Sequence, residues 1–104
     1  MARFDIYPNP TAPERGHTPF ILDVQNDHLG PMGTRVVLPL RTTKGFGPPA
    51  RGLNPLMDVD GKTVVVDTAA LAPVPAAPLR KPVARADAWR NDVQDAPDTL
   101  FGSY

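Results

Sequence analysis

The sequence predicts a mainly β protein, a small antiparallel barrel with a short C-terminal helix. Three observations lead to this fold class. The chain of 104 residues contains 14 prolines, and because each proline removes a backbone donor and fixes φ, they exclude long helices before about residue 84. Short runs of β-branched and aromatic residues lie between the prolines. One stretch near the end repeats apolar residues at helical spacing.

The first half of the chain predicts three strands. Residues 3–7 alternate enough to form the first, and residues 8–19, with four prolines, indicate a loop. Residues 20–25 are rich in β-formers and are the strongest strand candidate. Residues 34–40 form the next strand. Pro39 within it predicts an edge position or a strand end, because proline cannot donate to a ladder.

The second half predicts a loop, a hairpin and an edge segment. Residues 41–54 are rich in glycine and contain two adjacent prolines, which is typical of a mobile surface loop. Strands are expected at residues 56–59 and 62–67. The Asp60-Gly61 pair between them is the usual signal of a type I′ turn, in which both central residues take positive φ. Residues 71–79 hold three prolines and allow only a short edge strand.

A helix is expected after residue 86. Asp87 is a plausible N-cap, and acidic residues that follow it suit the positive end of a helix dipole. Pro97 interrupts the pattern, and in a helix interior it would cost about 3 kcal/mol, so the helix should stop at Ala96 or kink there. The predicted apolar stripe consists of Trp89, Val93, Ala96 and Leu100.

Charge and composition favour a protein partner over nucleic acid or membrane. The chain has 11 basic and 11 acidic side chains, whereas nucleic-acid binding depends on neutralising phosphates. The stretch from Asp87 to the end contains four aspartates and one arginine, and it would be repelled by a phosphate backbone. There is no cysteine, no signal-peptide pattern and no apolar run of about 20 residues. We therefore expect one soluble cytoplasmic domain spanning residues 1–104.

The residues that catalysis requires are scarce. Only His17 and His28 could serve as imidazole bases, and both lie in segments that resemble turns. Asp23 and Asp27 are more simply explained as a turn cap and a surface charge. The glycines of residues 45–52 do not form a phosphate-binding loop. The sequence predicts no enzyme, no metal and no cofactor.

Two segments carry a resemblance to a known family: Phe20-Ile21-Leu22-Asp23-Val24-Gln25-Asn26-Asp27 and Gly33-Thr34-Arg35-Val36-Val37-Leu38-Pro39-Leu40. Together they look like the central hairpin of the CcdB family of toxins from bacterial toxin–antitoxin modules. The order of further pieces is also similar, so that the resemblance covers nearly the whole chain. These pieces are Phe4-Asp5-Ile6-Tyr7, Asn54-Pro55-Leu56, the Asp60-Gly61 hairpin, the stretch from Asp67 to Pro75, and Asn91-Asp92-Val93.

The resemblance implies an SH3-like barrel, a homodimer and no catalytic activity. Family toxins bind the A subunit of DNA gyrase in its DNA-cleaved state and block religation. A cognate antitoxin releases gyrase through a disordered C-terminal segment, and the complex represses its own operon, with the antitoxin contacting DNA. The resemblance does not identify antitoxin-binding residues here. An alternative is a relative that no longer poisons gyrase but still binds an antitoxin or another partner, and a third is an unrelated structural domain.

The C-terminus departs from the family pattern, which ends Phe-Trp-Gly-Ile and contacts gyrase through its last three residues. This chain ends Leu100-Phe101-Gly102-Ser103-Tyr104. An ungapped alignment places Phe101 at the Phe position, and a shift by one residue places it at the Trp position and keeps the glycine. The tail is either a frayed terminus or a pair of aromatic anchors. The expected gyrase-binding residues are Phe101, Gly102, Ser103, Tyr104, His28, Leu29 and Phe4.

Overall fold

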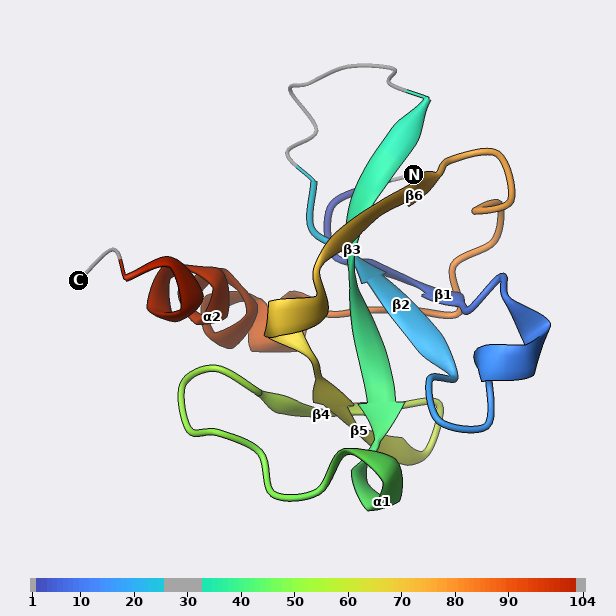
Figure 1. Cartoon of the computed structure of the whole chain (residues 1–104). Helices are drawn as coiled ribbons and strands as arrows, with labels where there is room; N and C mark the ends of the chain where they lie inside the picture. Colours follow the sequence, from blue (N-terminus) through green and yellow to red (C-terminus); the bar gives the residue numbers. More distant parts are fainter. Residues whose placement is uncertain (1, 26–32, 103–104) are drawn as a thin grey trace.

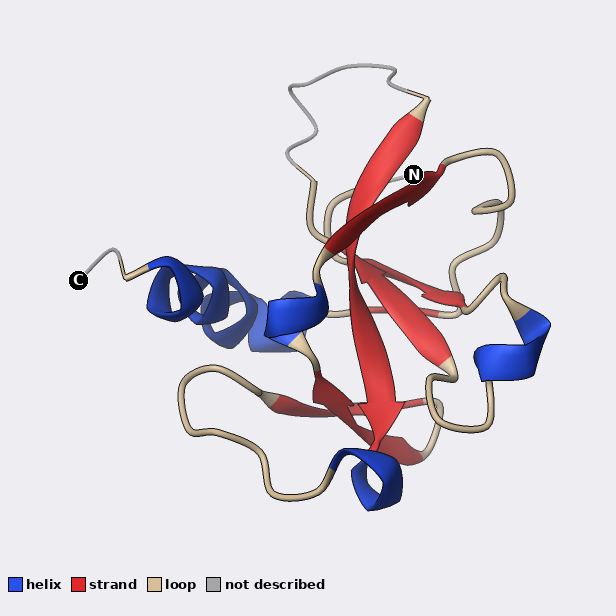
Figure 2. Ribbon diagram, viewed as in Figure 1, coloured by secondary structure: helices blue, strands red, loops and turns tan. Residues whose placement is uncertain are grey.

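The computed structural model describes residues 2–25 and 33–102 (Figure 1). Strands dominate it, as Figure 2 shows. They are β1 (Asp5–Pro8), β2 (Phe20–Asp23), β3 (Thr34–Thr42), β4 (Leu56–Val59), β5 (Lys62–Val66), β6 (Ala72–Pro75) and β7 (Ala84–Arg85). The helices are α1 (Thr43–Phe46) and α2 (Arg90–Phe101), with 3-10 turns η1 (Ala12–Glu14), η3 (Thr68–Ala70) and η4 (Asp87–Trp89).

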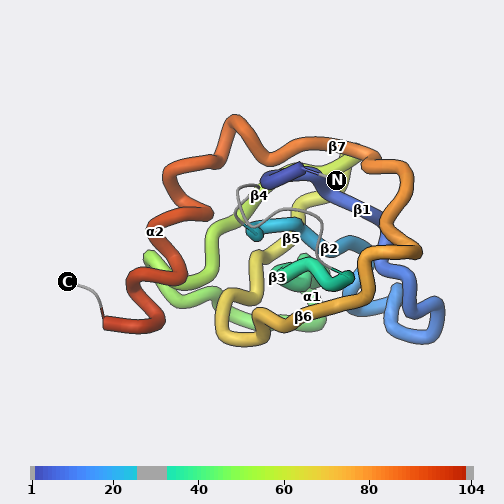
Figure 3. Tube along the Cα trace, turned by 90° about the horizontal axis from the view of Figure 1, so that it is seen from above, coloured from blue at the N-terminus to red at the C-terminus, as the bar shows by residue number. Residues whose placement is uncertain are grey.

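The strands form a nearly closed antiparallel barrel. They pair in the order β4-β5-β3-β2-β1-β7, and β6 pairs with β3 beside this path. In Figures 1 and 3, α2 lies outside the sheet at one side of the molecule, whereas η1 lies at the opposite side. The predicted fold class, a mainly β SH3-like barrel with a short C-terminal helix, is therefore confirmed.

Strand β3 is longer than predicted, and Pro39 lies inside it, so the prediction of a sheet edge or strand end is wrong. On one side β3 pairs with β2. On the other it pairs first with β6, through residues 34–37, and then with β5, through residues 40–42. The Asp67 N–H donates to the Pro39 carbonyl at 2.9 Å. Since the N–H and C=O of one strand residue point the same way, the missing donor of Pro39 faces the gap between β6 and β5.

The Asp-Gly hairpin is confirmed. Asp60 has φ 52° and Gly61 has φ 79°, as a type I′ turn requires of both central residues. Residues 59 and 62 pair across it, and Met57 pairs with Val64. The predicted edge segment is also confirmed as β6. The predicted loop of residues 41–54 differs from the structure at its start, because β3 runs to Thr42 and α1 follows directly.

Alternation along the strands produces two apolar layers. The larger one fills the barrel and includes Ile6, Leu22, Leu38 and Val64, against which Val93 of α2 packs. A smaller cluster, Tyr7, Ile21, Val37 and Leu79, lies on the other face of the sheet. Because side chains point to alternate faces, the odd-numbered residues of β1 to β3 belong to this second face.

Helix α2 differs from the sequence prediction in two ways. It continues through Pro97 to Phe101, so of the two predicted outcomes, a stop at Ala96 or a kink there, the stop is wrong. Val93 and Ala96 are buried beneath it, and their burial offsets the loss of one backbone hydrogen bond at Pro97. Asp87 does not cap α2. It begins η4, and its carboxylate accepts hydrogen bonds from Arg85 at 2.7 Å and from Arg90 at 3.4 Å.

A charged network is buried on the second face of the sheet. The Arg35 guanidinium donates to both Asp23 oxygens, at 2.7 and 2.9 Å, and both side chains are almost fully buried. Beside it, Asp5 forms an ion pair with Arg85 and accepts the Tyr7 hydroxyl at 3.2 Å. Burial, together with the negative charge of Asp5, raises the pKa of Tyr7 to about 12.

This shift predicts alkaline destabilisation through Tyr7. The pKa in the fold lies above the ordinary value of 10.0, so the neutral phenol stabilises the fold fully below pH 10. That contribution is lost as the pH rises from 10 to about 12, and it amounts to about 2–3 kcal/mol. Tyr7→Phe should remove this part of the pH dependence and cost about 1 kcal/mol at neutral pH. Urea unfolding from pH 7 to 12 measures both effects, and identical slopes for the two proteins above pH 10 would contradict the assignment.

Candidate functional site

The end of α2 presents the most exposed large apolar side chain among the described residues. Phe101 is 67% exposed, compared with 48% for Leu56 and 45% for Val83. Large aromatic side chains at a surface are the usual anchors of protein interfaces. We call Phe101 and Gly102, with the last helical turn that carries them, the helix tip.

The helix tip is held in place by contacts that the earlier part of α2 makes with the core. Val93 and Ala96 are buried, and Trp89 packs partly against the core just before the helix begins. The guanidinium groups of Arg3 and Arg90 both lie over the Phe4 ring, 5.1 and 5.2 Å from its centroid. Arg90 is the first residue of α2, so the contact with Phe4 connects the start of the first strand to the helix.

Phe4 was expected at the binding surface, and the structure places it in the core instead. It is only 4% exposed, and its backbone lies at φ 74°, a region that bulky residues avoid. Its N–H donates to Asp23 O at 2.7 Å, and its carbonyl accepts from the Ala86 N–H at 2.8 Å. These bonds explain why the conformation is tolerated. The buried Phe4 ring contacts Arg90 of α2 and so helps to position the helix, and its expected part in gyrase binding stays a prediction.

Gly102 ends the helix. It has φ 71° in the left-handed region, and its N–H donates to the carbonyls of Asp98 and Thr99. This is the usual glycine position just after a helix. Any other residue would be strained there, so the glycine of the tail has a structural reason to be present.

A shallow groove runs beside α2, and we call it the Pro97 groove. It has a volume of about 350 Å³. Half-buried apolar side chains from β3 and from neighbouring segments line it together with the helix, among them Val24, Val36, Leu71 and Pro97. Gln25 also lines it, and its side-chain oxygen accepts from the Val36 N–H at 3.0 Å. Sequence reasoning did not find this groove, because Pro97 was interpreted only as a helix breaker.

Four of the predicted site residues lie outside the described residues: His28, Leu29, Ser103 and Tyr104. Their common face with Phe101 stays a prediction. Gln25, three residues before His28, lies in the Pro97 groove beside α2. Of the seven predicted residues, the structure thus places Phe101 and Gly102 at the surface and Phe4 in the core.

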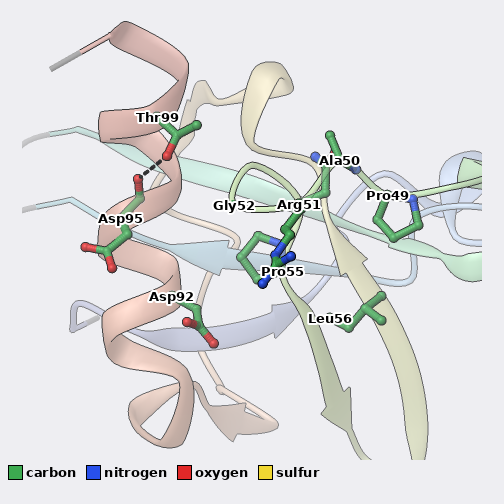
Figure 4. Close-up of a pocket in the computed structure, with 10 residues that line it drawn as sticks. Pro49, Ala50, Arg51, Gly52, Pro55, Leu56, Asp92, Asp95 and Thr99 are labelled. Carbon is green, nitrogen blue, oxygen red and sulfur yellow. Dashed lines mark hydrogen bonds between the residues drawn. The ribbon is translucent and has the colours of Figure 1, made fainter. Parts of the chain in front are cut away.

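Two further hollows were not foreseen from the sequence. One has a volume of about 620 Å³ and lies between α2 and the segment that leads into β4 (Figure 4); we call it the α2–β4 cleft. The other, of about 360 Å³, is lined by Arg15, Arg80 and Lys81 with Tyr7 and three prolines, and we call it the basic groove. Its residues come from segments that are far apart in the sequence, so no local motif could reveal it.

The described part of the chain holds neither a metal-binding cluster nor a membrane-spanning helix. Within residues 2–25 and 33–102, no cluster of three or more His, Cys, Asp or Glu side chains could hold a metal ion. No helix in the same ranges has the length and apolar character needed to cross a bilayer.

Because Phe101 at the helix tip is exposed whereas Val93 is buried, truncating these two side chains should change the free energy of unfolding by very different amounts. Val93→Ala should lower the free energy of unfolding by about 2 kcal/mol, because a buried side chain is truncated. Phe101→Ala should change it by less than about 0.5 kcal/mol, because the ring is mostly exposed. Chemical denaturation measures both. A loss at Phe101 as large as that at Val93 would show that the tip is part of the core.

Comparison with known proteins identifies the family. The family model described as CcdB protein matches residues 3–102, nearly the whole chain. No curated protein matches the sequence. The chain therefore belongs to the CcdB family, the toxins of toxin–antitoxin modules, which act by binding rather than by catalysis.

Proposed function

We propose that this member of the CcdB family is the toxin of a type II toxin–antitoxin system and inhibits DNA gyrase by trapping the gyrase A subunit in its DNA-cleaved complex. The observation that carries the proposal is Phe101, an aromatic side chain 67% exposed at the end of α2. It lies within the tail that corresponds to the gyrase contact of the family. A cognate antitoxin neutralises the toxin.

The helix tip suits an anchor because its support is rigid. An exposed aromatic gains affinity only if ordering it costs little entropy. Here buried Val93 and Ala96, together with the contact between Phe4 and Arg90, hold α2 in place before any partner binds. Truncating an interface aromatic commonly costs 2 kcal/mol or more, which is roughly a thirtyfold loss of affinity.

The toxin acts in the cytoplasm as a binding protein, without cofactor or catalysis. Its own surface is a poor match for DNA, because α2 carries Asp92, Asp95 and Asp98 and the chain has no net charge. In the repressor complex the antitoxin therefore supplies the DNA contact.

The basic groove is the surface we assign to the antitoxin. Arg15, Arg80 and Lys81 line it, and no carboxylate is among its lining residues. An acidic segment would pair with these cations while its apolar side chains cover the prolines. In Figure 1 the η1 side, where Arg15 follows, lies opposite α2. Two partners thus have two separate surfaces.

A second candidate function has a specific observation in its favour. The tail lacks the usual tryptophan-glycine-isoleucine ending, so the chain could bind an antitoxin without poisoning gyrase. Toxicity on induced expression, relieved by a resistant gyrase A subunit, distinguishes the two functions. Growth that continues on induction would favour the non-poisoning module.

A homodimer is also part of the proposal. Val93 and Ala96 of the predicted apolar stripe are buried within one chain, so they do not form a two-fold contact. The half-buried apolar lining of the Pro97 groove remains for a two-fold contact. Light scattering at micromolar concentration should give twice the chain mass of 11.2 kDa. A monomer mass throughout that range would reject the dimer.

Deletion of Phe101 to Tyr104 tests the poisoning surface. We expect toxicity to be abolished, while the melting temperature and the antitoxin complex change little, because the barrel core does not include Phe101. Phe101→Ala alone should cause most of the loss, roughly thirtyfold in gyrase affinity. Tyr104→Ala should matter less if the shifted alignment applies and more if the ungapped one does. Growth assays with gyrase and antitoxin binding measure these effects.

The matched control reverses charge at the other end of the molecule. Arg80→Glu with Lys81→Glu should weaken antitoxin binding and leave toxicity in place, because both residues line the basic groove. If a tail-deleted protein still arrested growth, the surface that poisons gyrase would have to lie elsewhere on the molecule. If the charge-reversed protein lost its toxicity, the basic groove would also be needed for poisoning, and the two surfaces would not be separate.

A further inference from the structure

Strand β4 has a free edge. It pairs with β5 on one side and ends the path of paired strands, so among the described residues no strand covers its other side. An uncovered strand edge presents backbone donors and acceptors that another chain can pair with. In Figure 4, β4 runs between β5 and α2, and its free edge faces the helix.

The hairpin register identifies the backbone groups at this edge. In a two-residue hairpin the closing pair, Val59 and Lys62, is hydrogen-bonded, and such pairs recur at every second residue. The bond from the Val66 N–H to the Pro55 carbonyl, at 2.9 Å, continues this series. The intervening residues Leu56 and Asp58 therefore point their N–H and C=O away from β5.

Other edges are less suited to pairing. Strand β6 pairs with β3 through Ala72 and Val74, so that Pro73 and Pro75 occupy its outer side and remove two donors there. Strand β7 has only two residues. In the described chain β4 is thus the edge that can accept a partner strand.

The α2–β4 cleft provides side-chain contacts beside this edge. It has a volume of about 620 Å³, and Leu56, 48% exposed, contributes apolar surface to it with Pro49 and Pro55. Figure 4 shows the Asp92 carboxylate pointing from α2 toward β4, whereas the Asp95 carboxylate points away. Arg51 lines the cleft from the opposite segment.

The cleft has two charges of opposite sign available. Within the described residues, neither Arg51 nor Asp92 forms an ion pair or a side-chain hydrogen bond. They are located on separate segments: Asp92 on α2 and Arg51 on the segment that leads into β4. A partner that carries one charge of each sign can therefore satisfy both.

We propose that the α2–β4 cleft binds an extended segment of a partner protein, which adds as a strand to the free edge of β4. The backbone of the segment pairs with Leu56 and Asp58. An apolar side chain of the segment covers Leu56, a basic one pairs with Asp92 and an acidic one with Arg51. Main-chain bonds supply affinity and the side chains supply specificity, as in other complexes formed by strand addition. This site adjoins the helix tip, because Thr99 of the last helical turn also lines the cleft, but the proposal does not rest on the proposed gyrase poisoning.

Selection from a phage-displayed library of short random peptides on the full chain tests the proposal. We expect enriched peptides to alternate apolar residues with at least one acidic and one basic residue. Leu56→Pro, which removes an outward donor but no bond to β5, and Asp92→Asn should each weaken their binding by about tenfold. Asp98→Asn is the matched control, because Asp98 lies on the same helix but lines the Pro97 groove; it should leave binding unchanged. Fluorescence anisotropy with the enriched peptides measures these affinities.

A second measurement guards against misfolding of the proline variant. In the isotope-labelled wild-type protein, the amide protons of Leu56 and Asp58 should become protected from exchange when an enriched peptide binds. Leu56→Ala, which keeps the donor, should lose affinity but retain this protection at saturating peptide. Failure to enrich any peptide, unchanged protection at both amides, or equal effects of the two aspartate substitutions would overturn the proposal. Loss of toxicity on tail deletion has no bearing on these outcomes.

Discussion

Strand β3 is the element on which the rest of the sheet depends, because β2, β5 and β6 all pair with it. Strand β3 is nine residues long, which is enough for it to pair first with β6 and then with β5 along the same side. Proline at position 39 falls where the chain passes from one partner to the other, and the donor it lacks has no strand opposite it. Arg35 on the same strand joins Asp23 in a buried, two-bonded ion pair. Removing one member of such a pair leaves an uncompensated buried charge, which is costly, so a shift of the β2–β3 register that separated the pair would be disfavoured.

The position of the helix tip depends on Phe4, which connects α2 to the barrel. Its ring contacts the guanidinium groups of Arg3 and Arg90, and the Phe4 backbone forms hydrogen bonds with Asp23 and Ala86. The start of the chain, the end of β2 and the beginning of α2 are therefore fixed together at one point. A helix anchored in this way can carry an exposed aromatic without flexibility at its base. The same anchoring places Asp92 against the free edge of β4, so that one packing arrangement orients both proposed binding surfaces.

The sequence predicted those parts of the fold that depend on interactions between residues close together in the chain. The Asp60-Gly61 turn depends on two backbone angles, and the strands depend on alternation, so both were found. The predictions for Pro39 and Pro97 rested on the backbone hydrogen bond that each proline cannot donate. In the fold, Pro39 lies where β3 passes from β6 to β5 and no donor is needed, and the burial of Val93 and Ala96 offsets the hydrogen bond lost at Pro97. Asp87 bonds to Arg85 and Arg90 instead of capping, because guanidinium groups compete with backbone donors. The burial of Phe4 could not be predicted because it depends on residues far along the chain, and the three unpredicted hollows arise from equally distant segments.

The separation of the proposed surfaces constrains how neutralisation could work. The helix tip and the basic groove lie at opposite sides of a molecule about 35 Å across. An antitoxin segment confined to the groove would not overlap gyrase bound at the tip. Displacement by overlap therefore needs a segment that spans the molecule, about ten extended residues at 3.3–3.6 Å each. The alternative is a coupling free energy between the two sites, which requires two conformations of the barrel. A long, extended antitoxin segment needs no second conformation of the barrel, so it is the simpler physical solution.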